Sequence, residues 1–210
     1  MTCNNRLLLF TRYPEVGRTK TRLIPALGAE AAARLQWVLT ERIIRQAKSL
    51  AEEYGIPTTV HYSGGSKEDM ASWLGPLTYV VQAQGDLGLR MQKAFTHTFA
   101  EGTESAVLIG SDIPDISVPL LTEAFAALLN AKAVIGPSHD GGYYLIGLRS
   151  DGARALYPLL FEEMVWSTPT VFAQTLERLN TTGASIAVLP TLRDIDLPDD
   201  LQFAQEKGLL

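Results

Sequence analysis

The sequence has little cysteine and histidine, no surplus of positive charge and no long apolar run. Its single cysteine, Cys3, excludes an intrachain disulfide, and its three histidines are too scattered for a zinc site. The formal net charge of −5 argues against a nucleic-acid or membrane partner, because both normally require a basic surface. No apolar segment approaches the ~20 residues of a membrane span, and the run Leu7–Phe10 is too short for a signal peptide. We therefore expect a cytoplasmic protein.

What is present is ordinary for a globular protein. The chain has 210 residues, of which 46% are hydrophobic and 20% charged, and this is enough for a sizeable core. Internal repeats, low-complexity tracts and Ser/Gly linkers are absent from the sequence. We predict a single domain over residues 1–210.

Short β-branched or apolar runs alternate with amphipathic helical patterns along the chain. This alternation predicts a mostly parallel sheet covered on both faces, with ligands bound beyond the carboxyl ends of its strands. The predicted strands are 6–11, 58–62, 79–82, 106–109, 133–136, 143–148 and 186–189, and the predicted helices are 29–54, 67–74, 87–100, 119–129, 169–180 and 198–207.

The first predicted strand leads directly into a loop that carries four cations between Arg12 and Arg22. Arginine forks and backbone N–H groups beside a glycine suit phosphate oxygens, although neither the Walker nor the Rossmann spacing is present. The alternative is a solvated basic loop. A turn at Gln84–Gly85 is predicted either to read the base or to be purely structural. The predicted phosphate-binding residues are Thr11, Arg12, Gly17, Arg18, Thr19, Lys20 and Arg22.

Carboxylates follow two of the predicted strands. Asp112 comes directly after the strand 106–109, where a carboxylate suits a metal that bridges phosphates, unless it only caps the next turn. Asp194 and Asp196 alternate after the last strand, so an extended backbone places both on one face. We predict that these three aspartates hold Mg²⁺ or Mn²⁺.

A glycine-rich connection between two strands is the candidate acceptor or sugar site. Paired glycines, Gly141 and Gly142, allow close backbone approach to a ligand, and Asp140 offers a carboxylate for a sugar hydroxyl or a metal. A plain turn is the alternative. Trp166 is predicted either to line the acceptor pocket or to be a buried core residue.

Six motifs, in this order, resemble the nucleotide-diphospho-sugar transferase superfamily, and more closely a bacterial family described as glycosyltransferases. The motifs are Pro14-x-x-Gly17-x-x-Lys20-Thr21-Arg22-Leu23, Gly85-Asp86-Leu87-Gly88-x-Arg90, Gly110-Ser111-Asp112-x-Pro114, Asp140-Gly141-Gly142-Tyr143-Tyr144-Leu145-Ile146-Gly147, Trp166-Ser167-Thr168 and Asp194-x-Asp196-x-Pro198-x-Asp200-Leu201. The resemblance implies an α/β fold of the GT-A type, a three-layer α/β/α sandwich with a mostly parallel mixed sheet. It also implies a nucleotide over the first half of the sheet.

Two of these motifs are also similar to those of other nucleotidyltransferases. The Lys20-Thr21-Arg22-Leu23 stretch and the acidic ending resemble 2-phospho-lactate guanylyltransferases, and the ending resembles molybdenum-cofactor nucleotidyltransferases. The resemblance implies that Lys20 and Arg22 bind phosphates and that Asp112, Asp194 and Asp196 bind metal. The stretch from Asp112 to Asp115 lacks the Asp-x-Asp of typical glycosyltransferases of this fold.

We therefore expect an enzyme that transfers a nucleotidyl group from a nucleoside triphosphate to a small phosphorylated or hydroxyl acceptor. Lys20, Arg22 and Asp112 are its predicted catalytic residues. One alternative is a glycosyltransferase that uses a nucleoside-diphosphate sugar, and another is a nucleotide-binding module without turnover. The oligomeric state, including a homo-oligomer, is left open.

Overall fold

A computed structural model describes residues 4–210, so Cys3 lies outside the described part of the chain. Its centre is a seven-stranded sheet with the order β3-β2-β1-β4-β6-β5-β7. The strands are β1 (Asn5–Arg12), β2 (Thr58–Ser63), β3 (Thr78–Val81), β4 (Ser105–Gly110), β5 (Ala133–Pro137), β6 (Tyr143–Arg149) and β7 (Ile186–Val188). Strand β6 is antiparallel to both neighbours, and the other pairs are parallel.

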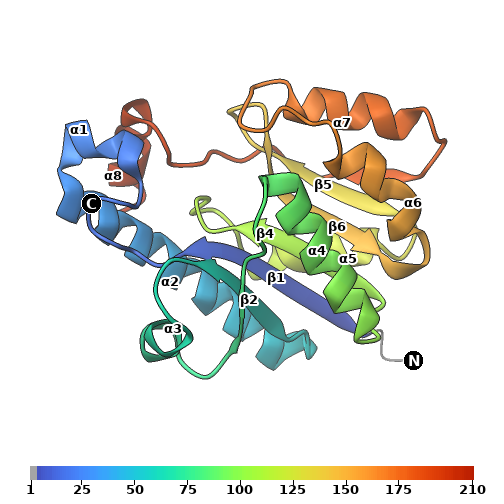
Figure 1. The fold of residues 1–210 in the computed structure, drawn as a ribbon, viewed down its shortest axis with the longest axis horizontal. Helices are drawn as coiled ribbons and strands as arrows, with labels where there is room; N and C mark the ends of the chain where they lie inside the picture. Colours follow the sequence, from blue (N-terminus) through green and yellow to red (C-terminus); the bar gives the residue numbers. More distant parts are fainter. Residues whose placement is uncertain (1–3) are drawn as a thin grey trace.

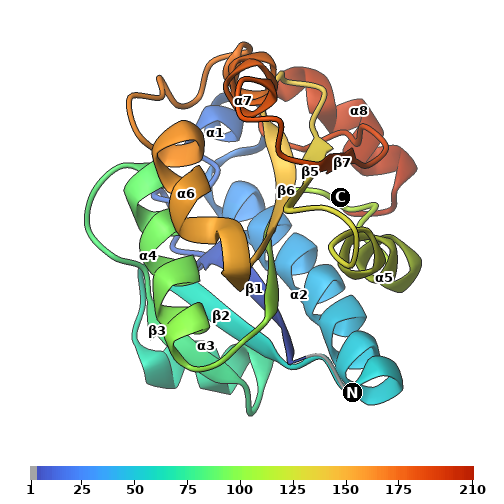
Figure 2. The same ribbon diagram turned by 90° about the vertical axis from the view of Figure 1, so that its right-hand side faces the viewer.

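Helices cover both faces of this sheet. The α-helices are α1 (Ile24–Leu27), α2 (Ala29–Tyr54), α3 (Lys67–Leu74), α4 (Leu87–Ala100), α5 (Val118–Ala127), α6 (Ser150–Phe161), α7 (Val171–Asn180) and α8 (Leu201–Glu206), and short 3-10 turns are Thr21–Leu23 and Pro198–Asp200. Helices α4 and α6 lie on one face, and α2 and α5 lie on the other (Figure 2). The three-layer α/β/α fold predicted from the sequence is confirmed.

Strand β1 shows why the sheet lies in the centre. Leu7, Leu8 and Leu9 are fully buried because helices cover both faces of the sheet, which is usual for parallel strands. Their side chains alternate, so Leu7 and Leu9 pack with α2, α3 and α5, whereas Leu8 packs with α4 and α6. Burial on both faces holds β1 in the centre of the sheet. Its carboxyl end forms part of the site described below.

Helix α2 has the bounds predicted from its apolar stripe, and it ends at Gly55 in the left-handed conformation, with φ +68°. Within residues 4–210, no helix is both long and apolar enough to cross a membrane.

A third apolar cluster joins the two ends of the chain. Leu23, Leu35 and Leu39 from the first part of the chain pack against Ile195 and Ala204 from the last part. From β7 the chain therefore crosses the molecule to α8, which lies beside α1 and the start of α2 (Figure 1). This crossing brings the segment after β7 to the loop after β1.

Three elements differ from the sequence prediction. Helix α6 was not predicted, although Ala153, Leu156, Tyr157 and Leu160 carry a helical spacing, because Gly152 and Pro158 interrupt the pattern. Helix α7 begins at Val171 rather than at residue 169.

The shorter start of α7 has a local cause. The Thr168 hydroxyl, which directly precedes the predicted helix, does not cap it and donates to the Val165 carbonyl at 2.9 Å. The segment 21–27 differs as well, because it forms a 3-10 turn and the short α1 inside what we predicted to be a loop.

Candidate functional site

A cavity of about 480 Å³ lies at the carboxyl ends of β1, β2 and β4, the edge where the fold predicts a ligand. It collects residues from position 10 to position 196 of the chain. Its polar and charged lining residues are Thr11, Arg12, Arg22, Gln36, Ser63, Gln82, Arg90, Ser111, Asp112, Ser138, Asp140, Tyr143, Tyr144, Trp166, Ser167, Thr168, Asp194 and Asp196.

A hydrogen-bonded polar floor joins the ends of β1 and β4. The Gln36 amide nitrogen on α2 donates to the Ser111 hydroxyl at 2.8 Å and to Thr40 at 3.1 Å, and Thr11 bonds to both Thr40 and Ser111. All four residues are buried. Because the network is internally satisfied, it holds the two strand ends rigidly below the cavity.

Three arginines, Arg12, Arg22 and Arg90, line the cavity. Arg12 is the last residue of β1 and is exposed, and among residues 4–210 its side chain has no hydrogen-bond or ion-pair partner. Arg90 Nη1 donates to the Gln82 side-chain oxygen at 2.8 Å. Gln82 is itself fixed by donation to the carbonyls of Thr11 and His61. Arg12 was predicted, whereas Arg90 and Gln82 were missed; Arg90 belongs to a motif that we had quoted without assigning it a role.

Lys20 lies elsewhere than we predicted. Its side chain is only 3% exposed, and its Nζ lies 2.5 Å from Asp112 Oδ1 and 3.9 Å from Asp196 Oδ1. The same Nζ donates to the Ile195 carbonyl at 2.5 Å. Lys20 does not line the cavity. In this structure it is an internal cation that ties the segment after β7 to the segment after β4, and its predicted role in binding phosphates stays a prediction.

Three further residues of the predicted cation-rich loop, Gly17, Arg18 and Thr19, also lie outside the cavity lining. Arg18 is exposed and lies 3.8 Å from Glu15, whereas Thr19 is buried and donates to the Tyr13 carbonyl at 3.1 Å. Gly17 turns the chain with φ +78° in open space.

The predicted base-reading turn, Gln84–Gly85, lies outside the lining too. Gly85 has φ +121° and precedes Asp86, whose carboxylate caps α4 by accepting from the Leu89 N–H. This geometry favours the structural alternative for the turn.

The carboxylates Asp112, Asp140, Asp194 and Asp196 line the same cavity. Asp196 accepts from Arg22 Nη1 at 2.8 Å, so the two predicted residues form an ion pair. Burial and, after it, the nearby carboxylates of Asp140, Asp200 and Asp112 together raise the pKa of Asp194 to about 6. Asp140 itself accepts from Ser138 Oγ and from the Gly142 N–H. The structure therefore places the three predicted metal ligands, Asp112, Asp194 and Asp196, in one cavity together with Asp140.

The metal assignment stays a prediction. Among residues 4–210, no three His, Cys, Asp or Glu side chains are grouped so that they could hold one ion as they stand. The donors are nevertheless the hard oxygens that Mg²⁺ prefers, and Asp194 is destabilised by its acidic neighbours. Asp196 is neutralised by Arg22 and Lys20, which leaves Asp140 as the acid that most strongly affects Asp194.

Trp166 lies at the boundary between the cavity and the core, so it is not the fully buried core residue that was one of our two alternatives. It is half-buried and lines the cavity, and its ring packs edge-on against Tyr143 with centroids 6.3 Å apart. Its other side lies against α4, where a Cβ on Gly88 would come within 2.7 Å of the indole. The Tyr143 hydroxyl is buried without a partner in the described chain, and burial raises its pKa.

Comparison with known proteins identifies the family and relatives of this chain. Residues 46–168 match the family described as "Uncharacterized protein conserved in bacteria (DUF2064)". A crystal structure of a protein from Desulfovibrio desulfuricans G20, provisionally named a nucleotide-diphospho-sugar transferase, is 34% identical. The match covers 93% of this chain and 83% of that one, with a TM-score of 0.84. No curated protein matches the chain.

Two more distant structures share the fold alone. One is a 4-diphosphocytidyl-2C-methyl-D-erythritol synthase from Anaerococcus prevotii, at 15% identity, full coverage of both chains and a TM-score of 0.65. The other is a CMP:2-keto-3-deoxy-manno-octonic acid synthetase complexed with CTP, at 14% identity, 98% coverage of both chains and a TM-score of 0.58. The chain therefore belongs to the DUF2064 family of the nucleotide-diphospho-sugar transferase superfamily.

Proposed function

We propose that this protein is a nucleotide-utilising transferase that moves a nucleotidyl group from a nucleoside triphosphate to a small phosphorylated or hydroxyl acceptor. The observation that carries the proposal is that one cavity is lined by both arginines and carboxylates, at the strand edge where this fold binds ligands. Arginines suit a polyphosphate, and carboxylates suit a bridging cation or acceptor hydroxyls. In this proposal the whole chain acts as one domain.

Arg12 and Arg90 are the proposed grip on the phosphates. Both line the cavity, and the bond to Gln82 presets the guanidinium of Arg90. Lys20 and Arg22 contribute indirectly in this proposal, because they hold Asp112 and Asp196 in place. This differs from the sequence prediction, in which Lys20 binds the triphosphate.

Asp112 and Asp194, with Asp140 in the place that we had given to Asp196, are the proposed ligands of Mg²⁺ or Mn²⁺. Burial and then repulsion by the neighbouring carboxylates raise the pKa of Asp194, and a bound cation would offset both. When bound, the cation neutralises phosphate charge. The acceptor oxygen then attacks the α-phosphorus, the bond to the β-phosphate oxygen breaks, and pyrophosphate leaves. Such a reaction is accelerated mainly by the positioning of the reactants and by the neutralisation of phosphate charge.

The acceptor is proposed to lie between Asp140, Gly142 and Trp166, which line the cavity, while Gly141 shapes the turn behind them. The similarity of the Lys20–Leu23 stretch and the acidic ending to 2-phospho-lactate guanylyltransferases favours a phosphorylated acceptor. Glucose 1-phosphate and 2-phospholactate are therefore suitable probes.

A glycosyltransferase that uses a nucleoside-diphosphate sugar is the second candidate. The name of the Desulfovibrio desulfuricans relative favours it, since the two chains are 34% identical over most of their length. The same arginines would then bind a diphosphate, and the acidic group would lie near the sugar.

The released product separates the candidates. Thermal shift with the four nucleoside triphosphates and with nucleoside-diphosphate sugars, each with MgCl₂, identifies the donor. Release of pyrophosphate with a probe acceptor supports nucleotidyl transfer, and release of a nucleoside diphosphate supports glycosyl transfer. Binding without either product would support a non-catalytic module and contradict the proposal.

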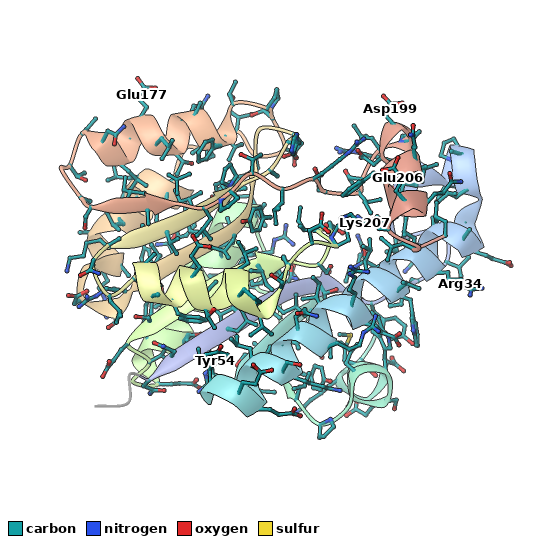
Figure 3. All side chains as sticks on the ribbon, turned by 180° about the vertical axis from the view of Figure 1, so that it is seen from behind. Arg34, Tyr54, Glu177, Asp199, Glu206 and Lys207 are labelled. Atoms are coloured by element: carbon teal, nitrogen blue, oxygen red, sulfur yellow. The ribbon has the colours of Figure 1, made fainter. Side chains whose placement is uncertain are left out.

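The matched variants for this experiment are Arg12→Gln and Arg34→Gln. Arg34 is exposed and points away from the body of the protein on α2 (Figure 3). Loss of a charged hydrogen bond at Arg12 should weaken donor binding about 10- to 100-fold, with unchanged stability. Arg34→Gln should leave donor binding unchanged, and equal affinities of the two variants would contradict the assignment of Arg12.

A further inference from the structure

The segment 162–170, which joins α6 to α7, forms one wall of the cavity. Trp166, Ser167 and Thr168 from this segment line it. Two of its residues have a left-handed backbone, with φ +51° at Glu163 and +62° at Ser167. Residues with side chains rarely adopt this conformation, and they keep it only where the surroundings hold the chain in place.

Arg178 on α7 supplies one of these restraints. Its Nη1 donates to the Glu162 carbonyl at 2.7 Å and to the Leu159 carbonyl at 3.4 Å, and its Nη2 donates to the Glu163 carbonyl at 2.7 Å. Among the residues that the structure describes, no carboxylate lies within ion-pair distance of Arg178. Its planar guanidinium donates instead to backbone carbonyls in and just after the end of α6, including the carbonyl of Glu163, whose backbone is left-handed.

The other end of the segment is held by the glycine-rich turn. A Cβ on Gly141 would lie 2.1 Å from the Pro169 carbonyl oxygen, so the two backbones are in direct contact. The Phe172 N–H donates to the Gly141 carbonyl at 2.9 Å. Trp166 therefore lies between two restrained parts of the segment. Arg178 holds Glu162 and Glu163 before it, and Gly141 contacts Pro169 after it.

We propose that Arg178 is a positioning residue for acceptor recognition. It does not line the cavity, so it acts through segment 162–170, whose indole and hydroxyl groups contact the acceptor. The acceptor part of this proposal rests on the proposed function, because it takes this wall to be the acceptor side.

The first test follows the exposure of Trp166. In a Trp37→Phe/Trp73→Phe background, Trp166 is the remaining tryptophan, so its quenching by acrylamide reports on the wall alone. Arg178→Ala should raise the quenching constant at least about two-fold, because the wall loses a restraint and opens locally. Arg178→Lys should give an intermediate value, since an ammonium can donate to these carbonyls but lacks the fork.

Two controls remove a charge without touching the wall. Glu177 lies on the outer face of α7 (Figure 3), and Arg154 is exposed on α6. Alanine at either position should leave the quenching constant unchanged. An unchanged constant in Arg178→Ala, or an equal rise in the controls, would overturn the positioning role.

The second test separates acceptor from donor. Arg178→Ala should bind the nucleoside triphosphates, titrated with MgCl₂, within about two-fold of the parent, because no donor-binding residue is lost. For each probe, glucose 1-phosphate or 2-phospholactate, that supports pyrophosphate release, KM should rise about tenfold at similar kcat. An equal loss of triphosphate affinity would overturn the acceptor role. If the parent binds no triphosphate, the proposed function fails, and the quenching result still decides the role of Arg178.

Discussion

Lys20 is the residue whose sequence prediction and structural position differ most. Its cationic neighbours led us to predict a phosphate ligand, but Lys20 has a left-handed backbone, with φ +50°, and its buried side chain contacts Asp112 and the Ile195 carbonyl. The local spacing could not reveal this, because the carboxylates come from distant segments. The position of Arg12 at the cavity, by contrast, could be predicted, since a residue at the carboxyl end of a central strand lies at the edge of the sheet where ligands bind.

The internal position of Lys20 makes a stability prediction. Lys20→Met should lower the free energy of unfolding by about 2–4 kcal/mol, because it leaves Asp112 and the Ile195 carbonyl without the buried ammonium that they contact. Lys132→Met, which removes an ion pair with Asp151 that is roughly half exposed, should cost less than about 1 kcal/mol. Urea unfolding of both variants measures the difference. Equal losses would contradict the internal-cation role.

Asp194 makes a pH prediction. Its pKa is raised to about 6 from an unfolded value of 3.8, so the folded state binds more protons between these values and stability falls as the pH rises through that window. Asp194→Asn removes this ionisation. The variant should therefore gain stability relative to the parent above about pH 6 in the absence of divalent cations. Urea midpoints from pH 4 to 8 test this, with the exposed Asp199→Asn as the control, and parallel curves for parent and Asp194→Asn would contradict it.

At the scale of elements, long periodic segments were predictable and irregular ones were not. Helix α2 and helix α4 have the predicted bounds because their apolar stripes and terminal signals agree. Helix α6 was missed because its glycine and proline hide the stripe. The wall between α6 and α7 was predicted only in part, since the sequence pointed to Trp166 but not to Arg178, which reaches it through backbone carbonyls.

The contact between the glycine-rich turn and segment 162–170 gives a prediction for these elements. Gly141 and Gly102 both have φ +87°, but a Cβ at Gly141 meets the Pro169 backbone whereas a Cβ at Gly102 meets nothing within 4 Å. Gly141→Ala should therefore cost about 1–3 kcal/mol more stability than Gly102→Ala, since only the backbone strain is common to both. Thermal unfolding compares the two variants. Equal shifts in Tm would contradict the prediction, because they would mean that segment 162–170 moves away from the added Cβ at no cost in stability.

At the scale of the whole molecule, the alternation of strands and helices was sufficient to predict a three-layer fold and the edge that carries the site. The order of the strands in the sheet could not be predicted from this alternation. The antiparallel β6 lies between β4 and β5, and no local sequence pattern encodes the contacts that place it there. The sequence also could not show which acidic residues form ion pairs and which do not. That depends on the crossing of the chain from β7 to α8.

That crossing also has a consequence for the order in which the protein is made. Lys20 and Arg22 leave the ribosome long before their partners, because Ile195 and Asp196 lie 175 and 174 residues further along the chain. The early strands of the sheet can pair while translation continues, yet the cavity lacks Asp194 and Asp196 until that later segment returns to the first loop. A nascent chain therefore holds much of the scaffold before its site is complete.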